Sequence, residues 1–97
     1  MSVPILNYDE VEKIRQQLAD ELDADSDGDW RHDYRPGSFG CHELLDRTAL
    51  LAAMLEEHLL THPACVANPD WYALADQAAT ILHELYQQVG KVHLEAE

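Results

Sequence analysis

The chain has 97 residues, of which 46% are hydrophobic, so its length and composition fit one domain with one modest core. Its 19 acidic and 6 basic side chains give a formal net charge of −13, which disfavours direct binding to nucleic acid or to anionic membranes, because both require a basic surface. No stretch approaches the ~20 apolar residues of a membrane span. Two cysteines are too few for a disulfide-rich secreted scaffold, and the opening MSVPILNYDE carries no pattern of a secretory signal, so we expect a soluble protein of the cytoplasm.

A first helix is predicted over residues 8–22. Asn7 followed three residues later by Glu10 is a capping-box pattern, which marks a helix start. Apolar residues then recur at spacings of three and four, which is the periodicity of one helix face. This stripe consists of Val11, Ile14, Leu18 and Leu22.

Residues 23–39 are predicted to form a long loop, whose front half matches the start of an EF-hand calcium loop. Alternating aspartates provide oxygen ligands, and Gly28 occupies the turn position. The position of the bidentate glutamate is held by Tyr34, so half of the signature is missing. Two interpretations stay open, a flexible acidic loop and a calcium site. The candidate ligands are Asp23, Asp25, Asp27 and Asp29.

The rear half of the same loop combines aromatic and basic side chains. Two arginines and two aromatics within six residues are able to stack on or grip a planar anionic ligand. In the alternative interpretation, the flanking aspartates neutralise the arginines and the aromatics fold back over the core. The candidate binding residues of this segment are Trp30, Arg31, Tyr34 and Arg35, with His42 and Glu43 at the following helix start.

A second helix is predicted over 40–60 and a third over 69–89. Asn68-Pro69 reads as an N-cap followed by proline at the first helical position, and Gly90 is the expected stop. Because the connection between the two helices is short, they should pack as an antiparallel hairpin. The expected core stripes are Leu44, Leu51, Leu55 and Leu59 on one helix, with Thr48 and Ala52 beside them, and Trp71, Ala75, Ala78, Leu82, Leu85 and Val89 on the other.

No segment alternates like a strand, so the predicted fold is all-α, a single domain over 1–97 built as a small three-helix bundle. Leu50 and Met54 fall on the polar side of the second helix and need a cover. The core is rich in alanine and the domain is small. These features favour a homo-oligomer.

The histidines suggest a metal site. With the hairpin paired so that His83 lies opposite Arg47, His42, Asp46 and His83 approach one end of the bundle as a mixed histidine and carboxylate set for a divalent metal. The alternative is that His58 and His83 lie at helix-face boundaries, half-buried and hydrogen-bonded. Cys41 beside His42 lacks an identifiable orienting group and oxyanion pocket, and no residue set specifies an enzyme.

The sequence therefore predicts a small acidic helical interaction or regulatory protein that uses the segment around residues 30–43. Its partner would be a protein or a small anionic ligand. One alternative is a metal-binding bundle, through His42, Asp46 and His83 or through the Asp23–Asp29 loop. Another is an acidic mimic of nucleic acid that binds a basic protein, which the charge of −13 permits.

Overall fold

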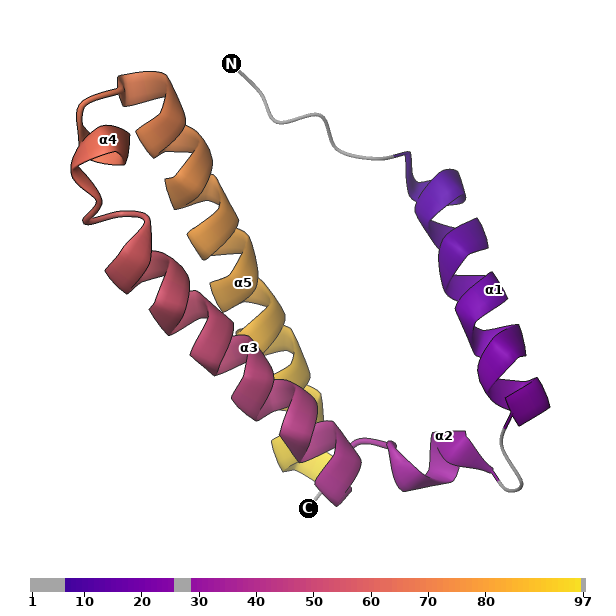
Figure 1. Cartoon of the computed structure of the whole chain (residues 1–97). Coiled ribbons are helices and arrows are strands. Elements are labelled where there is room, and N and C mark those ends of the chain that lie inside the picture. Colours follow the sequence, from indigo (N-terminus) through magenta and orange to yellow (C-terminus); the bar gives the residue numbers. More distant parts are fainter. Residues whose placement is uncertain (1–6, 26–28, 97) are drawn as a thin grey trace.

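The computed structural model describes residues 7–25 and 29–96 (Figure 1). This part of the chain is helical and contains no strand, which confirms the all-α prediction. The helices follow the order α1 (Tyr8–Asp25), α2 (Trp30–Asp33), α3 (Phe39–His58), α4 (Pro63–Val66) and α5 (Pro69–Ala96). Across the described residues, no helix combines the length and the apolar character that a membrane crossing needs.

Helices α3 and α5 form an antiparallel hairpin, and α4 lies in the connection between them (Figure 1). Capping hydrogen bonds stabilise the first turn of each of these two helices. The hydroxyl of Ser38 accepts from the Cys41 N–H at 3.1 Å at the head of α3. The Oδ1 atom of Asn68 accepts from the N–H groups of Asp70 and Trp71, both at 3.1 Å, so the predicted N-cap of α5 is present.

Helix α5 does not stop at Gly90. It continues to Ala96 and is 28 residues long, so the expectation that this glycine ends the helix was wrong. Gly90 is buried, and a Cβ built there would lie 3.5 Å from Leu45 Cδ1. An alanine at this position would therefore make an ordinary contact with Leu45. Helix α1 likewise runs three residues past the predicted end, to Asp25.

The contact between α3 and α5 is made mainly by small and polar residues. The buried positions of α3 are Leu45, Thr48 and Ala52. The predicted leucine stripe lies beside this contact, and Leu44 and Leu51 remain about half exposed (48% and 54%). Close packing of two helices selects the narrow residues for the seam, so the larger leucines border it. On α5 the buried positions are Ala79, Gly90 and His93.

Helix α1 stands apart from the hairpin, at the other end of the short α2 (Figure 1). Its four stripe residues Val11, Ile14, Leu18 and Leu22 are 43% to 55% exposed. The radius of gyration is 16.7 Å, against about 12.6 Å expected for a compact chain of this length. The structure thus forms the hairpin of the expected bundle without bringing α1 against it.

Candidate functional site

Asp23, near the end of α1, contacts Trp30 and Arg31 at the start of α2. We call this set of contacts the elbow. One oxygen, Asp23 Oδ1, accepts from Trp30 Nε1 at 2.8 Å and from an Arg31 guanidinium nitrogen at 2.7 Å. The Arg31 guanidinium also lies over the Trp30 ring, 4.3 Å from its centroid. Hydrogen bonds from Arg31 and then Trp30 lower the pKa of the Asp23 carboxyl. Asp23 therefore neutralises Arg31, as in the alternative interpretation in which the flanking aspartates neutralise the arginines.

The aspartate run is divided between several structural positions. Asp29 caps α2 and accepts from the Arg31 N–H at 3.2 Å. Asp25 is the last residue of α1, and Asp27 lies outside the described residues. Two members of the predicted calcium set, Asp23 and Asp29, thus already hold the elbow together.

Tyr34 joins α2 to the start of α3. A Cβ placed on Gly40 would lie 2.3 Å from the Tyr34 ring, so only glycine fits beneath this ring. Arg35 donates to the carbonyl of His32, in its own turn. Both ends of the α1–α2–α3 connection are therefore fixed by specific contacts.

The predicted binding segment reaches a shallow apolar groove at one end of the hairpin, with a volume of about 390 Å³. Tyr34 and Leu44, which line it from the α2–α3 side, are 58% and 48% exposed. Residues from α5 form the other wall. The full lining is Tyr34, Pro36, Cys41, Leu44, Gln88, Val89 and Val92. Such a surface suits an apolar side chain or one turn of a helix.

His42 belongs to a chain of hydrogen bonds beside this groove. The Gly37 N–H donates to His93 Nδ1 at 2.8 Å, so the proton of that ring sits on Nε2, which faces His42 Nδ1 at 3.3 Å. The Nε2 atom of His42 is 3.6 Å from Asp46 Oδ1. His93 is buried, with 1% exposure. The sequence interpretation missed His93, because the helix was expected to end before it.

His83 does not lie with His42 and Asp46 in the structure. Its Nε2 lies 2.7 Å from Glu56 Oε1. Glu56 follows Asp46 by ten residues on α3, which is about 15 Å along a helix. Arg47, the expected neighbour of His83, pairs with Glu43 at 3.3 Å. Within residues 7–25 and 29–96, no three His, Cys, Asp or Glu side chains gather closely enough to hold a metal ion.

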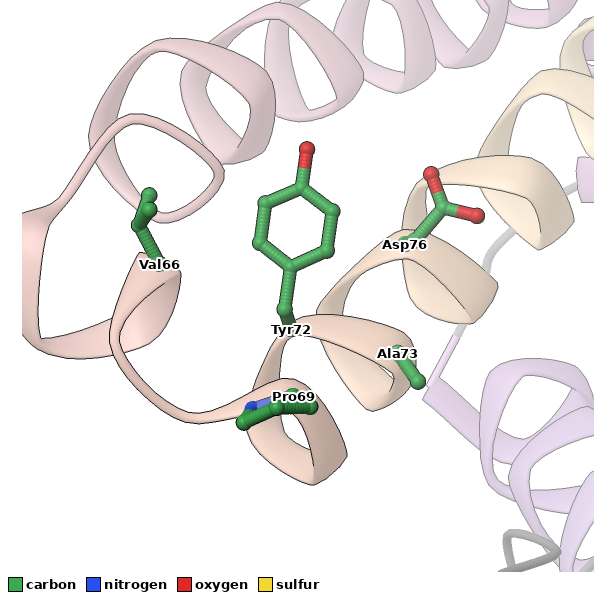
Figure 2. A pocket seen from close by; sticks show the side chains of 5 residues that line it. All are labelled: Val66, Pro69, Tyr72, Ala73 and Asp76. Atoms are coloured by element: carbon green, nitrogen blue, oxygen red, sulfur yellow. The ribbon is translucent and has the colours of Figure 1, made fainter.

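A second pocket, of about 440 Å³, lies where α4 meets α5 (Figure 2). Val66, Pro69 and Ala73 form its apolar part. The Tyr72 hydroxyl and the Asp76 carboxylate lie toward the same side of it (Figure 2). An apolar surface with one carboxylate suits the stem and charged end of a lysine or arginine side chain. The spacing of Tyr72 and Asp76, four apart on a helix, is the only sequence signal for it.

Comparison of the chain with protein-family models, with curated proteins and with solved structures found no match.

Proposed function

We propose that the chain is a small acidic interaction protein that binds a partner protein through the groove between the 30–43 segment and α5. The observation that carries this proposal is the groove itself, an open apolar surface next to the segment that the sequence analysis selected. Phe39 in the same segment is 86% exposed, which adds a second large apolar group at the start of α3. Exposed apolar surface of this kind is typical of protein contact sites.

The partner that we infer offers an apolar side chain or helix turn to the groove and carries a positive charge around it. The net charge of −13 attracts basic proteins and repels acidic ones. A small anionic ligand is less well supported, because Arg31 is paired with Asp23 and Arg35 bonds to its own turn. The positive groups that such a ligand needs are thus already engaged.

The test compares two matched substitutions on opposite sides of the hairpin. Leu44→Glu places a charge in the groove, whereas Ala53→Glu places one on the opposite side of the α3–α5 seam, which Glu56 and His83 also line. A photo-crosslinking residue at position 92 should give one defined protein adduct in cells, and position 53 should give none. Titration calorimetry with that identified protein should show at least a tenfold loss of affinity for Leu44→Glu and little change for Ala53→Glu.

Raising the salt concentration should weaken this binding, because the charge attraction is screened. Equal adducts from positions 92 and 53, or no adduct from position 92, would contradict the proposal.

A further inference from the structure

The hairpin has one apolar side and one mixed side. Leu44 and Val89 line the same groove, which places them on the same side of the seam. Steps of three, four and seven residues keep a helix face, so this side continues along both helices. The opposite side is lined by Ala49, Ala53, Glu56, His83 and Tyr86. The continuation of the apolar side consists of Leu51 and Leu55 on α3 and Leu82 and Leu85 on α5.

This apolar side is uncovered. Leu51 is 54% exposed, and Leu85 is 43% exposed. Leu55, near the end of α3, and Leu82, in the middle of α5, are only partly buried. A run of leucines along two adjacent helices is a surface that a further helix covers in a bundle.

The chain carries one matching surface, the stripe of α1 formed by Val11, Ile14, Leu18 and Leu22. Helix α1 has 18 residues and α3 has 20, so at 1.5 Å per residue they span about 27 and 30 Å. The stripe is 43% to 55% exposed, as are Leu51 and Leu85 on the hairpin face, whereas Leu55 and Leu82 are partly buried. Two unpaired apolar surfaces of one chain, similar in length, favour pairing with each other.

Helix α1 lies apart from its own hairpin in the structure (Figure 1). Asp23 binds Trp30 and Arg31 at one end of α2, and Tyr34 fits over Gly40 at the other end. Folding α1 back onto the same chain would require these contacts to change. Receiving the α1 helix of another chain leaves them intact.

The accessible surface of the chain is larger than expected for a folded monomer, which agrees with a surface that a second copy covers. The accessible surface is 7740 Å², about 2,100 Å² more than the ~5,600 Å² typical of a folded monomer of this mass. Two copies that each bury this excess would share an interface of about 4,000 Å², within the range of permanent dimers.

We propose that the chain forms a two-fold dimer in which α1 of each copy covers the Leu51, Leu55, Leu82 and Leu85 face of the other copy's hairpin. The same contact is made twice, as two-fold symmetry requires. The inference stands apart from the groove binding proposed above, which concerns the Leu44 and Val92 end of the hairpin.

The test uses light scattering on the full-length chain and two single variants. Wild type should have twice the mass of one 11.0 kDa chain. Leu18→Glu in α1 and Leu51→Glu in α3 should each weaken the dimer by at least about a hundredfold, because each puts two charges into the interface. The control Gln16→Glu adds a charge to an exposed position of α1 outside the stripe and should leave the mass unchanged.

Mixing the two variants decides which helix covers which hairpin. A mixed dimer joins the intact α1 of the Leu51→Glu chain to the intact hairpin of the Leu18→Glu chain, so one of the two contacts is restored. The mixture should associate at least tenfold more tightly than either variant alone, which also shows that both chains fold.

Three results would overturn the proposal. A wild-type mass of 11.0 kDa means that no second copy binds. A dimer unaffected by Leu18→Glu means that the hairpins pair without α1. A mixture that associates no better than the separate variants means that α1 is not exchanged between copies.

Discussion

His93 is the residue with the strongest structural role in the hairpin. It joins the end of α5 to the turn before α3 through the Gly37 N–H, and it faces His42 through its other nitrogen. Gly37 has φ of +87°, a conformation in which glycine is favoured, so the donor is delivered by a turn of specific shape. A buried polar side chain with partners on two elements restricts how those elements pack.

Replacing His93 should destabilise the fold. His93→Ala leaves a cavity and removes the acceptor of the Gly37 N–H, which together cost about 2–4 kcal/mol and lower the melting temperature by on the order of 10 °C. Thermal unfolding at matched protein concentration measures the effect. The control His58→Ala, at an exposed position of α3, should stay within about 0.5 kcal/mol of wild type. Equal effects of the two substitutions would remove the role assigned to His93.

Gly40 and Tyr34 form a pair that a double substitution tests. Gly40→Ala alone should destabilise by about 1–3 kcal/mol, because its Cβ would enter the Tyr34 ring. With Tyr34→Ala already present, the same change should cost less, because the ring is gone and only the Asp33 carbonyl oxygen, 2.9 Å from the Cβ position, still opposes it. Chemical denaturation of the four chains gives the coupling. Additive effects would show that the ring does not restrict position 40.

At the scale of elements, the elbow links the position of α1 to the charge of Asp23. Its carboxyl has a pKa below the ordinary 3.8, because Arg31 and then Trp30 hydrogen-bond to the ionised form. Because this pKa is lowered in the folded chain, the contacts of Asp23 with Arg31 and Trp30 are fully formed when the pH is above the ordinary pKa of aspartate. They are lost as the pH falls through the pKa of Asp23 in the folded chain. The elbow should therefore loosen only in strong acid.

The fluorescence of Trp30, measured with Trp71→Phe to remove the other tryptophan, follows this loosening. Its emission should move toward that of the Asp23→Asn variant as the pH falls below about 4, while the variant itself should change little. A transition near neutral pH, or an equal transition in Asp23→Asn, would contradict the assignment.

The elements also show what sequence patterns reveal and what they miss. The caps at Ser38 and Asn68 and the hairpin connection follow from local residue chemistry, which is readable in the sequence. On α3, Thr48 and Ala52, which were expected beside the leucine stripe, are buried, whereas Leu44 and Leu51 are about half exposed, because periodicity finds the apolar face but does not tell which of its residues meet a narrow seam. His93 was missed because the helix was expected to end at residue 89, and because its contact with Gly37 spans 56 residues, beyond any local pattern.

The candidate site was also predictable only in part, because one wall of the groove is local in the sequence and the other depends on contacts between distant residues. The segment 30–43 stood out by composition, and Tyr34 lines a groove with Leu44. The other wall of that groove comes from Val89 and Val92, whose approach depends on the pairing of two long helices. The position of His83 depends on the same pairing, and it lies against Glu56 in place of the expected Arg47.

At the scale of the whole molecule, the net charge opposes association of two copies, whereas the exposed apolar surface favours it. Two copies that each carry −13 repel one another, so the dimer should tighten as salt is added. Binding of a basic partner should weaken under the same change. Salt dependence therefore separates the self-association of the chain from its proposed partner binding.

The most direct test of the account is the molar mass of the unmodified chain by light scattering over a range of protein and salt concentrations. We expect twice the 11.0 kDa of one chain, with dissociation shifted to lower protein concentration as salt rises. A mass of 11.0 kDa at every concentration and salt level would contradict it, because the apolar sides of α1 and of the hairpin would then remain uncovered by a second copy.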